Sequence, residues 1–264
     1  MKLKRLKYYF KIWWLMNVKN ILPTLSHNWT FLVFLFGKVI RFIFFGTFIF
    51  FLLSGSRSLS GYNLNQAMFF YLTFFLIDTV SGFLFREVYK FRPLVIAGTF
   101  DMTLLKPMNP LFRVLMGGAD VIDLITVPPL IYLIFHYGGF LSPSYINIFY
   151  YILLVFNGVL IAAAFHIAVL ALGIVTFEID HTIMIFRDLE SLGRFPVDIY
   201  KQPLQAAITY ILPIGVMVTF PAKAFMGLMS FGGIVLSLLI GVIGIILSLK
   251  FWNFALKKYT SASS

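Results

Sequence analysis

The chain has 264 residues, of which 60% are hydrophobic, 19% aromatic and only 12% charged. A soluble domain of this length needs more charged surface, so the composition excludes a soluble globular protein and predicts an all-α polytopic membrane protein. The formal net charge of +11 at pH 7 would suggest a nucleic-acid partner in a soluble protein. Here lysine and arginine lie between apolar runs, which membrane orientation and anionic lipid explain better, so we expect no nucleic-acid partner. The absence of cysteine excludes disulfides and thiolate metal sites.

Residues 1–28 form a basic, amphipathic segment in which six lysine and arginine residues alternate with large apolar ones. Trp13 and Trp14 beside lysines suit a helix that lies in the membrane interface, because both side-chain types keep a polar end in water. We therefore predict an interfacial helix on the cytoplasmic surface, with membrane lipid as its partner.

Six apolar runs follow, and each is long enough for the ~20 helical residues that cross a hydrocarbon core of ~30 Å. The predicted spans of this transmembrane domain, 29–252, are 29–53, 65–85, 111–137, 146–177, 204–222 and 231–252. Between the last two, residues 221–233 are expected to form a small hairpin that dips into the outer leaflet.

Orientation follows from the lysine and arginine residues. If the N-terminus is inside, 17 of the 21 lie in inner segments and two in outer loops. The inner segments are then 1–28, 86–113, 178–203 and 250–264. The positive-inside rule therefore predicts that both termini are cytoplasmic, with 253–264 as a tail.

The polar loop 86–110, between the second and third spans, carries too many helix signals for a plain connector. Pro93 prevents a helix from running straight through, because it lacks an N–H and disfavours α geometry in the preceding residue. Gly98 interrupts the chain again, and Thr99 is expected to cap a short helix over 100–105 by accepting a backbone hydrogen bond.

This short helix is expected to point Phe100, Leu104 and Leu105 outward on the cytoplasmic face. Asp101 lies in its first turn, where the helix dipole favours an anion. A short capped helix with exposed apolar side chains needs a surface to pack on, so we interpret it as a docking element for a partner protein. The alternative is that it packs only on its own membrane surface.

Charged residues also lie inside the first three predicted spans: Lys38, Arg41, Asp78, Asp120 and Asp123. They lie roughly 12–18 Å from the inner ends of their spans at a rise of 1.5 Å per residue. Because unpaired charges at that depth are costly, we predict an intramembrane ion-pair network that ties the three spans together. A proton or ion relay through the aspartates is the alternative.

Sequence signals of catalysis are missing from the chain. It contains neither a GxxxxGK[ST] phosphate loop nor a GxSxG elbow. The four histidines are scattered, and no pair has the spacing of metal ligands. We therefore predict no catalytic, cofactor or metal site on this chain.

Two segments resemble the ABC-2-type permeases. GTFDMTLLKPMNPLF, at 98–112, is similar to the coupling-helix segment of that family, G-T-[LF]-[DE]-x-x-L-x-x-P. Residues 189–227 resemble a bacterial branch that carries a G-R-[FY]-P-x-x-[IV]-[YF] stretch before a span ending in a Pro-Ala pair. The matching positions are Gly193, Arg194, Phe195, Pro196, Ile199, Tyr200, Pro213, Pro221 and Ala222.

This resemblance implies the transmembrane subunit of an ATP-driven exporter in the bacterial cytoplasmic (inner) membrane. ATP and Mg²⁺ would bind a separate ATPase subunit, and a second permease subunit, with a heterodimer favoured, would complete the transporter. The ATPase-docking residues would be Arg92, Gly98, Thr99, Phe100, Asp101, Leu104, Leu105 and Lys106. The lack of large outer domains favours an apolar or amphiphilic cargo such as a lipid, a drug or a lipid-linked molecule.

Two rival interpretations remain open at this stage. A proton-coupled secondary transporter would use Asp78, Asp120 and Asp123 as its proton path and would need no ATP. A membrane-embedded enzyme would need a convergent His, Asp or Ser set, or a metal set, near one leaflet, and the sequence shows no such set.

Overall fold

The computed structural model describes residues 2–26, 28–56, 60–176 and 179–260, and every regular element in those ranges is a helix. Five helical stretches are long and apolar enough to cross a membrane, and a bent pair of helical arms can count as a sixth. The five stretches are Trp29–Gly55, Leu64–Ile96, Val121–Gly139, Tyr145–Thr176 and Phe231–Lys258. The prediction of an all-helical, multi-pass membrane protein is confirmed at this level.

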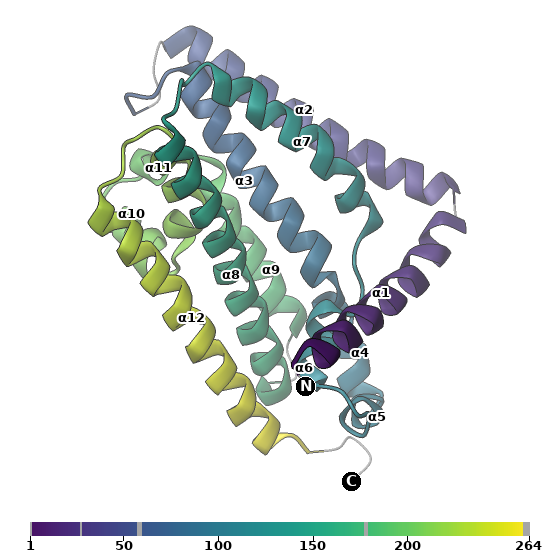
Figure 1. Cartoon of the computed structure of the whole chain (residues 1–264). Helices are drawn as coiled ribbons and strands as arrows, with labels where there is room; N and C mark the ends of the chain where they lie inside the picture. Colours follow the sequence, from purple (N-terminus) through teal and green to yellow (C-terminus); the bar gives the residue numbers. More distant parts are fainter. Residues whose placement is uncertain (1, 27, 57–59, 177–178, 261–264) are drawn as a thin grey trace.

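Figure 1 shows a bundle with two distinct ends. The helix α1 (Lys2–Ser26) begins at one end, where α12 (Phe231–Lys258) finishes, and this is called the terminal end below. The helices α3 (Leu64–Phe85) and α8 (Tyr145–Thr176) begin at the other end, called the distal end.

The centre of the bundle is built on α3 and α8, which are mostly buried, whereas only 6% of the membrane-length window of α2 (Asn28–Ser56) is buried. Such exposure suits a helix that faces lipid. Lipid chains are as apolar as the side chains of the spans, so the hydrophobic effect does little to bring helices together inside a membrane. Close packing at small residues holds the spans together instead. Gly158 of α8 shows this, because a Cβ at that position would lie 2.5 Å from the carbonyl oxygen of Met217.

The predicted third span, 111–137, is not one helix. The structure divides it into α6 (Pro110–Met116) and α7 (Val121–Gly139). Asp120 has an extended backbone and caps α7, accepting a hydrogen bond from the backbone N–H of Ile122 at 2.9 Å. The break includes Gly118, where an added Cβ would lie 2.2 Å from a carboxylate oxygen of Glu87. The close approach of that carboxylate requires glycine there.

The prediction that 178–203 lies on the inner side, away from the outer loops, is wrong. This segment contains α9 (Ile179–Ser191), and its contacts move steadily along α3 toward the distal end. Arg187 lies over the ring of Tyr89, beyond the C-terminal end of α3. Gly193 faces Phe74, 3.4 Å from an added Cβ.

Asp198 lies at the distal end of the bundle. It accepts a hydrogen bond at 2.8 Å from Tyr62, just before α3, and pairs with Lys223 at 2.7 Å. The sequence analysis placed Tyr62 and Lys223 outside and Asp198 inside, which these contacts contradict. Hydropathy missed the course of this segment along α3 because α9 carries charged residues that lower its apolar average.

The predicted fifth span, 204–222, is not a straight helix either. Its two arms, Leu204–Ile211 and Gly215–Phe225, meet at a bend of 74°. The arms include α10 (Leu204–Ala206), two π-helical turns at Ala207–Ile211 and Gly215–Thr219, and α11 (Phe220–Phe225).

Contacts show that the bent pair dips into the bundle and returns to the distal end. Pro213 at the bend lines the same groove as Ala164, in the middle of α8. Phe225, at the end of the second arm, stacks on Phe69 near the start of α3, with ring centroids 4.3 Å apart. The bent pair is therefore a hairpin, called the re-entrant hairpin below, and it occupies the predicted fifth span rather than 221–233.

The predicted tail, 253–264, is partly helix. The helix α12 continues to Lys258, and Tyr259 packs edge-on against Phe100 at a centroid distance of 5.2 Å. Residues 261–264 lie outside the described part of the chain.

Candidate functional site: a charged cavity and an apolar docking surface

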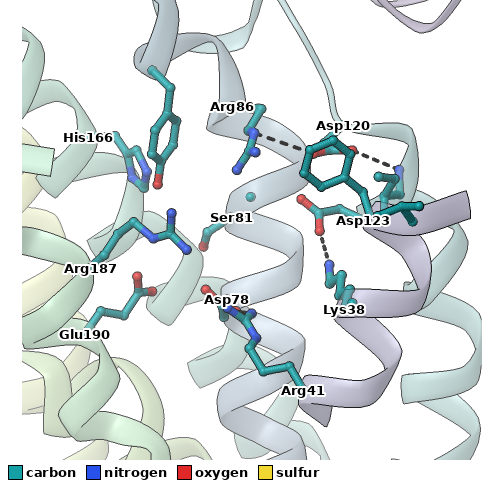
Figure 2. Close-up of a pocket in the computed structure, with 16 residues that line it drawn as sticks. Lys38, Arg41, Asp78, Ser81, Arg86, Asp120, Asp123, His166, Arg187 and Glu190 are labelled. Atoms are coloured by element: carbon teal, nitrogen blue, oxygen red, sulfur yellow. Dashed lines mark hydrogen bonds and ion pairs between the residues drawn. The ribbon is translucent and has the colours of Figure 1, made fainter. Parts of the chain in front are cut away.

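A cavity of about 310 Å³ lies among α2, α3, α7, α8 and α9. Figure 2 shows the side chains that line it. Eight charged side chains line it, four of each sign. The cations are Lys38, Arg41, Arg86 and Arg187, and the anions are Asp78, Asp120, Asp123 and Glu190. These eight residues define the charged cavity.

The five charged residues predicted to meet inside the membrane all line this cavity. Lys38 pairs with Asp123, and both side chains are more than four-fifths buried. Arg41 lies 3.7 Å from Asp78, a looser pair in which the arginine is half exposed. The first pair joins α2 to α7 and the second joins α2 to α3, as the network hypothesis requires. Whether these charges serve structure or transport stays a prediction.

Asp120 differs from the expectation in position and partner. It caps the start of α7 instead of lying within a span, and its ion-pair partner is Arg86 at 3.5 Å. Asp123 lies one turn into α7, over the backbone of α3. An added Cβ at Gly82 would lie 2.6 Å from its carboxylate, so glycine permits this contact.

Sequence reasoning missed the contribution of α9 to this cavity. Arg187 and Glu190 are one helical turn apart and both line it. Glu190 is 6% exposed, and its Oε1 atom has no hydrogen-bond partner among the described residues. Ser81 of α3, 2% exposed, also has an unpartnered hydroxyl there. The sequence signal that could have indicated this role of α9 is the spacing of Arg187 and Glu190, which are three positions apart on an amphipathic stretch.

His166 borders the cavity from α8. Its Nδ1 atom is 2.8 Å from the carbonyl oxygen of Ala162, and its ring packs against Phe85 and Phe186 at centroid distances of 5.2 Å. This histidine is therefore held in place by its own helix and by two aromatic rings.

The Gly193–Tyr200 segment joins α9 to the re-entrant hairpin. The ring of Phe195 packs on the ring of Phe45 at a centroid distance of 5.4 Å. The guanidinium carbon of Arg194 lies over the ring of Phe45, 5.5 Å from its centroid. Tyr200 donates a hydrogen bond to the carbonyl oxygen of Leu192 at 2.9 Å. Further members of this motif are Pro196, before a 3-10 turn, and Ile199, within that turn.

The remaining motif residues lie in the re-entrant hairpin. Pro213 is at the bend between its arms, Pro221 is in the first turn of α11, and Ala222 is fully buried. The motif therefore packs the hairpin against the bundle, and none of its residues lines the charged cavity.

The loop after α3 contains the predicted docking element, but two of its details are wrong. The helix α5 (Phe100–Leu104) has no side-chain cap, because Thr99 is itself helical and its hydroxyl donates to the carbonyl oxygen of Leu94 at 3.2 Å. Gly98, with a φ of +68°, makes the turn instead. Phe100 is fully buried rather than outward. The longer α12 covers it, since Trp252 and Tyr259 pack against its ring.

Four apolar side chains of this loop remain exposed at the terminal end: Ile96, Met102, Leu104 and Leu105. They define the α5 surface, in which Leu105 is the most exposed at 81%. Lys106 is exposed beside them, and Asp101 and Arg92 are half-buried. Pro93 lies in the first turn of α4 (Phe91–Ile96), where a missing N–H costs no helical hydrogen bond.

A buried carboxylate connects the α5 surface to the bundle. Glu87, in the 3-10 turn after α3, pairs with Arg113 of α6 at 2.5 Å and with Lys90 at 3.4 Å. The adjoining break between α6 and α7 is held by α1. There Asn17 accepts a hydrogen bond at 2.6 Å from the backbone N–H of Ala119. Thus α1 is a packed part of the molecule, although its other face exposes large apolar residues.

Together the fold and these features define a multi-pass, all-helical membrane protein with a charged cavity and an apolar surface at its terminal end. A family model described as ABC-2 family transporter protein matches residues 38–263. The chain therefore belongs to this family, which confirms the resemblance to ABC-2-type permeases, while the bacterial branch with the Gly193–Tyr200 motif stays a prediction. Neither the comparison with curated proteins nor that with solved structures found a match.

Proposed function

We propose that this chain is the permease subunit of an ATP-driven exporter of apolar or amphiphilic molecules. Family membership supports a membrane transport subunit. The observation that carries the proposal is the α5 surface, because the loop between α3 and α6 exposes apolar side chains where a membrane-spanning bundle ends. Exposed apolar patches of this kind mark protein–protein contacts. ATP and Mg²⁺ would bind the partner ATPase, and this chain would have no catalytic role.

The proposed topology keeps both termini in the cytoplasm of a bacterial cell, at the inner membrane. Six crossings result if α9 and the following residues to 199 make the fifth, and the re-entrant hairpin then enters from the outer side. The basic segments 1–28, 86–113 and 250–264 remain inside, as the positive-inside rule requires. Lys201 and Lys223 then lie outside, so the excess of lysine and arginine on the cytoplasmic side becomes smaller but does not reverse.

A connected route leads from the α5 surface toward the charged cavity. Glu87 pairs with Arg113 of α6, while the adjacent Arg86 pairs with Asp120 at the start of α7. A force on α5 and α6 would therefore act on the cavity through one short 3-10 turn. Tightly packed elements respond to such a force as rigid bodies, which makes the response switch-like. A second permease, identical or paralogous, would complete the transporter.

Co-purification tests the proposal. We expect the wild-type chain, extracted in mild detergent, to carry a soluble ATPase in a fixed ratio. Leu105→Asp should lose that ATPase, because a carboxylate in an apolar contact must be desolvated without a partner. Leu228→Asp is the matched control, since Leu228 is 54% exposed at the distal end. If both variants keep the ATPase, or the wild type transports without ATP, the proposal fails.

A further inference from the structure

Among the described residues, three groups in the charged cavity have no hydrogen-bond or ion-pair partner. The Oε1 atom of Glu190 and the hydroxyl of Ser81 are buried, with no hydrogen bond among the described residues. Arg187 has no carboxylate within ion-pair distance among the described residues, and its guanidinium lies over the ring of Tyr89, 5.9 Å from the ring centroid. Figure 2 shows the three side chains directed into one space, with Asp78 beside them.

Two further arginines hold their carboxylates only loosely. Arg41 is 3.7 Å from Asp78 and Arg86 is 3.5 Å from Asp120, and about half of each arginine side chain is exposed. Guanidinium groups bind oxyanions well because they present several N–H donors in a plane. Both arginines line the cavity, so part of this donor capacity is accessible to a ligand there.

The free groups have both signs, which restricts the ligand. A buried carboxylate inside a membrane is costly unless a cation or donor satisfies it. A simple anion would leave Glu190 unpaired, and a simple cation would leave the arginines unpaired. Arg187 and Glu190 lie one turn apart on α9, where Cβ atoms are about 5–6 Å from each other. A phosphate and a primary ammonium joined by two carbons match this separation.

The wall of the cavity points to lipid as the source of that ligand. Val33 and Phe34 of α2 line the cavity, and they are 66% and 63% exposed. The helix α2 is apolar and almost unburied, so this wall faces acyl chains. A head group can therefore enter the cavity from the side while its chains stay in the bilayer.

We propose that the charged cavity binds the head group of a phospholipid that carries a primary ammonium next to its phosphate. Glu190 and Ser81 accept hydrogen bonds from the ammonium, and Arg187 with Arg86 donates to the phosphate. The inference rests on the proposed function in one respect, because it names an aminophospholipid as the class of cargo for this permease.

Lipid retention tests the assignment directly. The purified wild-type complex would be reconstituted with equal parts of phosphatidylethanolamine, phosphatidylcholine and phosphatidylglycerol, re-extracted, washed, and its bound lipid quantified by mass spectrometry. We expect enrichment of phosphatidylethanolamine. The methylated ammonium of phosphatidylcholine has no N–H donors, and phosphatidylglycerol has no ammonium. Glu190→Gln should lower that enrichment about tenfold, the usual effect of losing a hydrogen bond to a charged group.

Matched variants separate binding from folding. Asp188→Asn, on the exposed side of the same helix, should retain the wild-type enrichment. Ser81→Ala should reduce the enrichment about threefold, the effect of losing one neutral hydrogen bond. This variant replaces Glu190→Gln in the test if Glu190→Gln does not yield a monodisperse protein. Equal retention of the three lipids by the wild type, or an unchanged preference in both cavity variants, would overturn the proposal.

Free phosphoethanolamine distinguishes the lipid from a soluble zwitterion. Displacement of the lipid only at a large excess of phosphoethanolamine supports a membrane source. Displacement at equal concentration would overturn that source. Failure of the proposed function would show separately, as a wild-type complex that lacks an ATPase yet still retains phosphatidylethanolamine.

Discussion

Replacing Glu87 by glutamine should weaken the fold at the base of the α5 surface. The side chain keeps its size but loses its charge, so Arg113 loses a bond of 2.5 Å to a carboxylate that is only 6% exposed. A hydrogen bond to a charged group contributes about 1.5–3 kcal/mol. Lys90 is half exposed at 3.4 Å and adds at most about 0.5 kcal/mol. We expect a total loss of about 2–3 kcal/mol.

Thermal denaturation in detergent, followed by tryptophan fluorescence, measures this loss. A decrease of about 4–12 °C in the apparent midpoint would match it, at about 2–4 °C per kcal/mol for a chain of this size. Arg113→Gln and the double variant complete a mutant cycle. Because Glu87 and Arg113 are in contact, the double variant should lose at least about 1 kcal/mol less than the sum of the single losses. Additive losses would refute the pairing, and Lys90→Gln should have almost no effect.

Two further predictions test the interior of the bundle. Gly158→Ala should lower the midpoint by several degrees, because its Cβ would lie 2.5 Å from a backbone oxygen of Met217 that cannot rotate away; an unchanged midpoint would contradict that packing. Asp123→Asn should cost about 3–5 kcal/mol by leaving Lys38 buried without a carboxylate. Exchanging the two residues should restore most of the yield of folded protein, and no rescue would exclude the pair as a structural link.

The charged cavity shows how far the sequence could lead. Lys38, Arg41, Asp78 and Asp123 were recognisable because a charge within an apolar run is costly and needs a partner. Their pairing was not recognisable, since Lys38 and Asp123 are 85 residues apart. Glu190 was hidden for a different reason. It belongs to a segment whose charges resemble those of a cytoplasmic loop, and only its neighbours show that it faces a cavity.

In the loop that contains α5, some features could likewise be predicted from the sequence and others could not. The interruption at Gly98 and the short helix that follows could be predicted, because backbone preferences act within a few residues. The side on which Phe100 lies could not, because it depends on how far α12 extends and where Trp252 packs.

By itself, the sequence determined the membrane class, the family, and the positions of α2, α3, α8 and the start of α12 to within a few residues. Hydropathy and motif spacing are local properties of the sequence, so they can be determined without knowledge of the tertiary contacts. The tertiary structure alone decided the break before α7, the course of α9 across the bundle, the re-entrant hairpin and the membership of the charged cavity. These features depend on distances between helices that are far apart in the chain, and a charged helix can line a cavity where a hydropathy average predicts a loop.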